Sequence, residues 1–185
     1  MFRFNRNPAG TPTETPAGIG DSLPRTDVSP SPGYDPALIP HLVADHALLK
    51  DLLGRLEDLA IHRQYARIPG TLLRFRDEVV RHIAEEDAHF YGPVLNALEN
   101  DAPERQRLER AHARMAGIAR LALLFVKHYD GLYVTTSTRE AFMRDLDVVA
   151  SLLADRIELE EMSLYALYER TNTAAATAPQ LRVVG

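Results

Sequence analysis

Apolar residues recur three and four residues apart along most of this chain, from about residue 35 to residue 171. That spacing places them on one face of an α-helix, and breaks in it divide the region into four long helices. The predicted helices run from Asp35 to about Gln64, from Pro69 to Leu98 with a bend at Gly92-Pro93, from Asp101 to Tyr129, and from Ser137 to Leu167. Short loops join them, so the sequence predicts an all-α, up-down-up-down four-helix bundle.

Polar side chains interrupt the apolar face of every predicted helix. In chain order, the residues at these inward positions are His46, His82, Glu86, His112, Arg156 and Glu160. Burying so many polar groups without partners would cost on the order of several kcal/mol in total. They must therefore pair with one another or with a metal ion.

Two stretches of the chain, 81–91 and 155–165, read as copies of one another. Both place an isoleucine, an acidic pair and a tyrosine at the same offsets. The first copy has His82 four residues before Glu86, so both side chains lie on one helix face and can reach one ion. The second copy has Arg156 in place of the histidine, and a guanidinium has no lone pair to give. The second copy therefore offers a metal only its glutamate.

Composition is typical of one compact domain with terminal extensions. The chain has 185 residues, of which 45% are hydrophobic and 25% charged. Residues 1–34 are rich in proline and small residues, which predicts a disordered tail. We expect residues 35–171 to form the bundle and residues 172–185 to form a flexible C-terminal tail.

Charge and cysteine content exclude several classes of function. The formal net charge of -5 and the absence of clustered Lys and Arg argue against a nucleic-acid surface. No apolar run is long enough to span a bilayer, and the N-terminus lacks the apolar stretch of a secretory signal. Cysteine is absent, so the sequence predicts no disulfide and no thiolate ligand. We expect a cytoplasmic protein.

The histidine and glutamate motifs resemble those of the hemerythrin-like HHE cation-binding family. The resemblance extends from about Pro40 to Glu169. Asp45-His46 and the leucines that follow are similar to the family's first motif, the stretch His82 to Glu86 is similar to the second, and His112 matches the third. In the fourth motif the chain keeps the glutamate and has Arg156 where the family has a histidine.

The resemblance implies a hemerythrin-like bundle with a non-haem di-iron centre. The metal ligands that it implies are His46, His82, Glu86, His112 and Glu160. Because Arg156 removes one ligand, the site would be incomplete and would hold one or two iron ions. Such a protein would bind or sense dioxygen, nitric oxide, or the iron and redox state. We expect no enzymatic activity, since the sequence supplies no substrate pocket.

Other residues near these motifs leave alternatives open. His89, one heptad after His82, is a substitute ligand in one interpretation and an outward or loop residue in another. Tyr91 and Tyr165 follow the two motif glutamates by five residues and could donate hydrogen bonds beside a metal or simply pack.

A second hypothesis needs no metal. Arg156 could satisfy Glu86 and Glu160 through bidentate hydrogen bonds. Parts of the second and fourth helices also look similar to anti-sigma regulators of the Rsd and AlgQ type. In this alternative the protein is a metal-free regulatory bundle with a protein partner such as a sigma factor.

Overall fold

The computed structural model describes residues 34–177 of the chain, and no β-strand occurs in this range. The helical elements are α1 (Leu38–Ile61), the short 3₁₀ helix η1 (Tyr65–Arg67), α2 (Ile68–Glu85), η2 (Glu86–Tyr91), α3 (Gly92–Ala97), α4 (Ala102–Tyr129), α5 (Arg139–Leu159), η3 (Glu160–Leu164) and α6 (Tyr165–Thr177). The segments η2 and η3 are π-helices that continue α2 and α5 without a break. The chain therefore forms four long helical rods.

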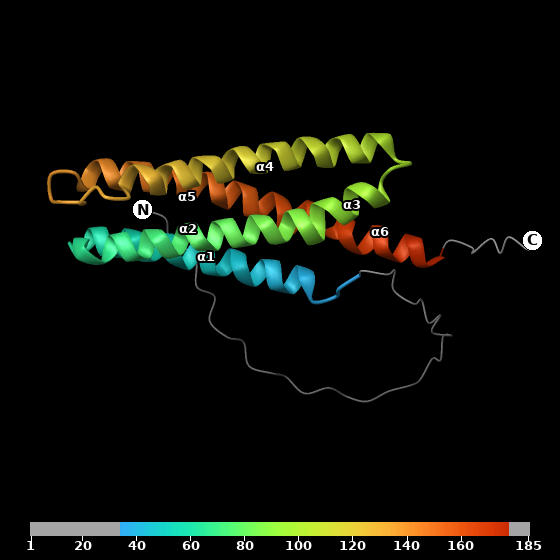
Figure 1. Cartoon of the computed structure of the whole chain (residues 1–185), viewed down its shortest axis with the longest axis horizontal. Coiled ribbons are helices and arrows are strands. Elements are labelled where there is room, and N and C mark those ends of the chain that lie inside the picture. The colour runs from blue at the N-terminus through green and yellow to red at the C-terminus, as the bar shows by residue number, and fades with distance from the viewer. Residues whose placement is uncertain (1–33, 178–185) are drawn as a thin grey trace, which may run out of the picture.

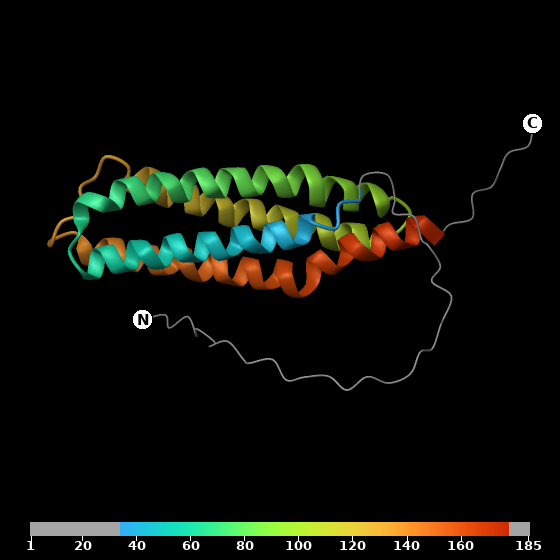
Figure 2. The same ribbon diagram turned by 90° about the horizontal axis from the view of Figure 1, so that it is seen from below.

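The rods lie roughly parallel to the long axis of the molecule and alternate in direction (Figures 1 and 2). The α1–α2 and α4–α5 connections lie at one end of the bundle, and the α3–α4 connection lies at the other (Figure 1). α1 packs against α2 and α5, and α4 packs against the same two helices. This confirms the predicted up-down-up-down four-helix bundle.

The ends of the bundle extend slightly beyond the predicted boundaries. Tyr34, which we expected in the N-terminal tail, stacks on Tyr168 with ring centroids 5.4 Å apart. The helix α6 continues to Thr177, past the predicted end at residue 171. The remaining parts of both predicted tails, residues 1–33 and 178–185, lie outside the described residues.

Apolar side chains form two separate clusters along the bundle. The larger includes Leu53, Phe75 and Phe142 toward the α1–α2 connection, and the smaller includes Leu42, Phe90 and Tyr168 toward the α3–α4 connection. The predicted inward polar residues on α1, α2 and α5 occupy the layer between these clusters. A polar group in that layer has little access to water, so it depends on partners within the protein.

The two π-helices begin at equivalent positions of the internal repeat. η2 starts at Glu86 and η3 starts at Glu160, the motif glutamates of the two copies. A π-helical turn contains an extra residue, which rotates the following side chains relative to an α-helix. As a result Phe90 is fully buried, whereas His89 is exposed. Of the two interpretations left open for His89, the structure agrees with the outward one, so His89 is not placed as a substitute ligand.

Gly92 follows the first π-helix at a tight point of the backbone. A Cβ atom at this position would lie 3.1 Å from the backbone oxygen of Asp87, closer than most Cβ contacts. We expect Gly92→Ala to lower the melting temperature, although alanine in a helix interior is ordinarily favoured over glycine by about 1 kcal/mol. Gly117→Ala on α4 is the matched control, since nothing lies within 4 Å of its Cβ position. Thermal denaturation should show opposite signs for the two variants, and stabilisation by both would contradict this explanation of Gly92.

Candidate metal centre

Four buried side chains from three rods meet in the polar layer of the bundle. His46 comes from α1, His82 from α2, Glu86 from the start of η2 and Glu160 from the start of η3. One nitrogen or oxygen atom of each lies within 4.8 Å of the corresponding atoms of the other three. His46 and Glu160 are 0% exposed, and His82 and Glu86 are 1% exposed. The group has the residue types and the spacing of a metal-binding site.

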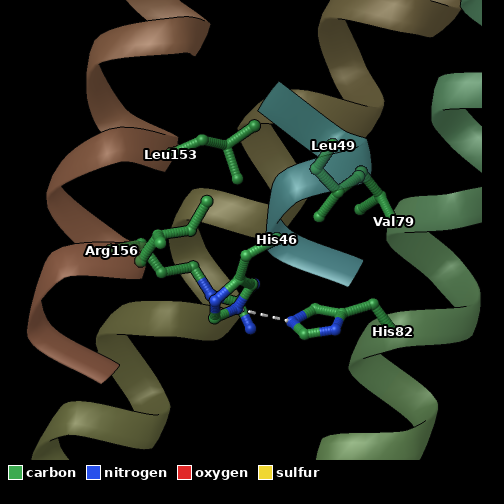
Figure 3. Close-up of a pocket in the computed structure, with 7 residues that line it drawn as sticks. His46, Leu49, Val79, His82, Leu153 and Arg156 are labelled. Atoms are coloured by element: carbon green, nitrogen blue, oxygen red, sulfur yellow. Dashed lines mark hydrogen bonds between the residues drawn. The ribbon is translucent and has the colours of Figure 1, made fainter. Parts of the chain in front are cut away.

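The two imidazole rings approach each other through their Nε2 atoms, which are 3.1 Å apart. Figure 3 shows this contact as a dashed line, with the aliphatic side chains of Leu49, Val79 and Leu153 on one side of it. The Nε2 atom of His46 lies 3.3 Å from Oε2 of Glu160, and Nε2 of His82 lies 3.5 Å from a Glu86 oxygen. The potential ligand atoms therefore converge on one small volume closed by apolar groups.

The Arg156 guanidinium joins the two carboxylates of this cluster. It is 4% exposed, its Nε donates to Oε1 of Glu160 at 2.9 Å, and its Nη2 donates to Oε2 of Glu86. Burial lowers the pKa of Arg156, but the charges of Glu160 and Glu86 outweigh this effect, and the pKa is raised. Arg156 is therefore a fixed positive charge beside the candidate ligands.

Two tyrosines complete the hydrogen bonding of the carboxylates in a crossed arrangement. The Tyr165 hydroxyl donates to Oε1 of Glu86 at 2.9 Å, and the Tyr91 hydroxyl donates to Oε1 of Glu160 at 3.3 Å. Each copy of the repeat thus supplies the donor for the glutamate of the other copy. Of the interpretations left open for these residues, hydrogen bonding at the site agrees with the structure, and both rings also pack in the apolar cluster.

One carboxylate oxygen remains without a donor. Oε2 of Glu160 is buried and makes no hydrogen bond to any described residue, although it lies 3.3 Å from Nε2 of His46. A buried anionic oxygen without a donor is costly. The structure therefore contains an orphan acceptor at the point where the two histidines converge.

Burial and neighbouring charges shift the protonation of the cluster. Burial, followed by the charges of His46 and Arg156, lowers the pKa of His82 to about 4. Burial and the charge of Glu160 raise the pKa of Glu86 against the effect of Arg156. Burial also favours the neutral form of Glu160, but the nearby His46 and Arg156 lower its pKa overall. The cluster thus combines a neutral His82 with an ionised Glu160, the forms that bind a metal, whereas Glu86, with a pKa raised to about 7, gives up a proton more readily when a cation is bound beside it.

The structure does not bring His112 into this cluster. Its side chain is 36% exposed, its Nε2 lies 2.7 Å from Oδ1 of Asp87, and its ring stacks on Tyr91 with centroids 4.2 Å apart. His112 and Arg156 both line a cavity of about 30 Å³ on the α4 side of the site. Four of the five predicted ligands therefore come together, and the fifth lies across this cavity at the edge of the bundle.

Asp45 and Glu161 contact the outer side of the histidines, a role that was not predicted for either residue from the sequence. Oε1 of Glu161 lies 2.8 Å from Nδ1 of His46, and Oδ2 of Asp45 lies 3.4 Å from Nδ1 of His82. The acidic pair of the repeat was a sequence signal for Glu161, which follows Glu160 directly. The contact of Glu161 with His46 on α1 depends on how the rods pack together, so the spacing of residues in the sequence could not predict it.

A second acidic group lies at the surface beside Asp45. His41, Asp45 and Glu85 place ligand-type atoms within 4.8 Å of one another. Arg81 already occupies this group, because its guanidinium donates to Asp45 at 2.5 Å and to Glu85 at 3.2 Å. The surface group is therefore an ion-pair network that holds Asp45 in place.

Comparison with known proteins agrees with a buried cation site in a four-helix bundle. The sequence profile of the hemerythrin HHE cation binding domain matches residues 37–168, and the chain belongs to this family. No curated protein and no solved structure was found to match the chain. Within the part of the chain that the structure describes, no helix has the length and apolar character needed to cross a membrane.

Proposed function

We propose that this protein binds a single iron ion through His46, His82, Glu86 and Glu160. The observation that carries the proposal is the buried Oε2 of Glu160, which has no hydrogen-bond donor and faces the imidazole nitrogens. A cation at this point would satisfy the orphan oxygen and separate the two Nε2 atoms that lie 3.1 Å apart. The residues present therefore fit a metal ion.

The types of ligand favour iron. Two imidazoles and two carboxylates form a mixed nitrogen and oxygen set, which suits iron better than the all-oxygen sites typical of calcium and magnesium. The absence of cysteine removes the thiolates that are common in structural zinc sites. The family membership of the chain supports a metal cation in general, and the donor set supports iron in particular.

Arg156 explains why one ion is expected instead of two. Its guanidinium donates a hydrogen bond to one oxygen of Glu86 and to one oxygen of Glu160, the motif glutamates of the two copies of the repeat. A positive charge within a few ångströms of a second cation would repel it by several kcal/mol at intermediate dielectric. The positive charge of Arg156 thus balances the two buried carboxylates in the place where a second metal cation would otherwise do so.

A bound iron ion supplies a centre for binding dioxygen or nitric oxide and for one-electron redox change. The cavity beside Tyr91, His112 and Arg156 has a volume of about 30 Å³, which accommodates a water-sized or diatomic molecule and no organic substrate. This supports a role in binding or sensing small molecules or the redox state instead of catalysis on a substrate.

The metal content of protein purified without chelator, from cells grown with ample iron, tests this proposal. We expect elemental analysis to give up to one iron per chain. Protein that contains zinc alone, or no metal, would contradict the proposal.

Removing a metal ligand should also make the melting temperature independent of whether metal is present. We expect His82→Ala to lose bound iron and to melt at the same temperature with and without chelator. The wild type should melt higher with metal, since binding at a hundred times Kd stabilises by about 2.7 kcal/mol. His112→Ala is the matched control, because this histidine lies outside the cluster and should leave both iron content and the chelator effect unchanged. Equal iron loss in both variants would show that the ligand set is wrong.

A metal-free regulatory bundle is the second candidate function. Arg156 bonds both buried carboxylates, which stabilises the core without an ion. In that case the wild type would contain no iron, and chelator would not change its melting temperature. A protein partner would then carry the function, as in the anti-sigma proteins that parts of the sequence resemble.

A further inference from the structure

Two carboxylates contact the candidate histidine ligands from outside the cluster. Glu161 belongs to η3, directly after Glu160, and is 31% exposed at its side chain while its Oε1 lies 2.8 Å from Nδ1 of buried His46. In an α-helix, consecutive residues point in directions about 100° apart. The π-helical start of η3 lets both residues reach His46, one at each ring nitrogen.

Asp45 plays the corresponding part for His82. Its Oδ2 lies 3.4 Å from Nδ1 of His82, and its Oδ1 accepts a hydrogen bond from Arg81 at 2.5 Å. The hydrogen bond from Arg81 fixes the orientation of Asp45 and leaves Oδ2 facing the histidine.

The contacts of His46 favour hydrogen on Nδ1. A carboxylate only accepts hydrogen bonds, and both ring nitrogens of His46 face one: Oε1 of Glu161 lies 2.8 Å from Nδ1, and Oε2 of Glu160 lies 3.3 Å from Nε2. The closer contact makes Nδ1 the donor. A neutral imidazole with hydrogen on Nδ1 has its lone pair on Nε2. The 3.1 Å hydrogen bond between the two Nε2 atoms needs hydrogen on one of them, and a cation in this place would take the lone pairs of both once each ring carries its hydrogen on Nδ1.

We propose that Glu161 and Asp45 are positioning residues that hold His46 and His82 with hydrogen on Nδ1 and so direct both Nε2 lone pairs toward the metal. This inference rests on the proposed metal-binding function. It assigns Glu161 and Asp45 a role through the histidines, without contact to the ion. Glu161 has the larger predicted effect because its contact is shorter.

The other copy of the repeat supplies a matched control. Asp87 occupies the position in the first copy that Glu161 occupies in the second, and it contacts His112 at 2.7 Å. The two pairs have similar chemistry, but His112 is not part of the cluster. Asp87→Ala therefore removes an equivalent carboxylate–histidine contact without touching a ligand.

The first test is anaerobic titration of chelated, full-length protein with Fe(II). Outer partners of metal-bound histidines typically contribute 10–100-fold to affinity, so we expect Glu161→Ala to weaken Fe(II) binding by about that factor. Glu161→Gln should recover most of the loss, because its amide oxygen still accepts from Nδ1–H. Asp87→Ala should bind as the wild type does.

The second test needs no metal. In chelated protein labelled with ¹⁵N-histidine, the ring nitrogen shifts of His46 should show hydrogen on Nδ1. The Nε2–H form should become populated in Glu161→Ala and stay minor in Glu161→Gln. A purely structural role for Glu161 would alter the melting temperature without this change of tautomer.

The outcomes separate the inference from the proposed function. If wild-type protein binds no Fe(II), the proposed function fails, whatever the tautomer of His46. If wild-type protein binds Fe(II) but Glu161→Ala binds it equally well, the positioning role is wrong and the metal site stands. An Nε2–H His46 in chelated wild-type protein would likewise overturn the positioning role.

Discussion

Replacing Arg156 with methionine will lower the free energy of unfolding of the chelated protein by about 3–5 kcal/mol. The substitution keeps most of the side-chain volume but removes the donor that bonds both Glu86 and Glu160. Both carboxylates are at most 1% exposed, so water cannot replace the guanidinium. Two buried acidic groups would then face each other without a counter-ion, and one of them would have to take up a proton.

Denaturant titration of chelated protein measures this loss. Arg76→Met is the control, since Arg76 is 43% exposed and pairs only with Asp77 among the residues that the structure describes. A surface pair of this kind is worth at most about 1 kcal/mol. If the two variants lose similar free energy of unfolding, Arg156 is not the counter-ion of the buried carboxylates.

Arg156→His will raise the iron content from about one ion per chain toward two. The repeat places Arg156 where the first copy has His82, so a histidine here restores an imidazole four residues before Glu160. The change also removes the positive charge that repels a second cation. His112 lines the cavity next to Arg156 and could then supply a further imidazole.

Elemental analysis and thermal denaturation of Arg156→His and wild-type protein together test this prediction. The metal-free alternative predicts no gain of iron and a lower melting temperature, because a neutral histidine would leave Glu86 and Glu160 without their counter-ion. Unchanged iron content with a lower melting temperature would therefore show that Arg156 has a structural role and that the protein functions without a second metal position.

The sequence was sufficient to predict the bundle and most of the buried polar layer. Inward residues on α1 and α5 keep the α-helical spacing up to the site, and His46, Arg156 and Glu160 are buried as predicted. Periodicity succeeds there because a regular helix relates sequence position directly to direction.

Helical periodicity gave the wrong position where the helix is not a regular α-helix. It also failed where the direction of a side chain does not determine its partner. The π-helix η2 turns His89 outward and Phe90 inward, and neither residue type marks that change. His112 has the predicted spacing on α4, yet it pairs with Asp87 at the bundle edge. The positions of Glu161 and Asp45 follow from contacts between rods, which a single sequence does not encode locally.

Anomalous X-ray scattering at the iron edge, on crystals of full-length protein loaded with Fe(II), would show directly whether the polar layer holds a single ion. We expect one peak per chain, at bonding distance from His46 Nε2, His82 Nε2, Glu160 Oε2 and an oxygen of Glu86. A peak at the surface group of His41 and Glu85, two peaks inside the bundle, or no peak at all would contradict the proposed single-iron site.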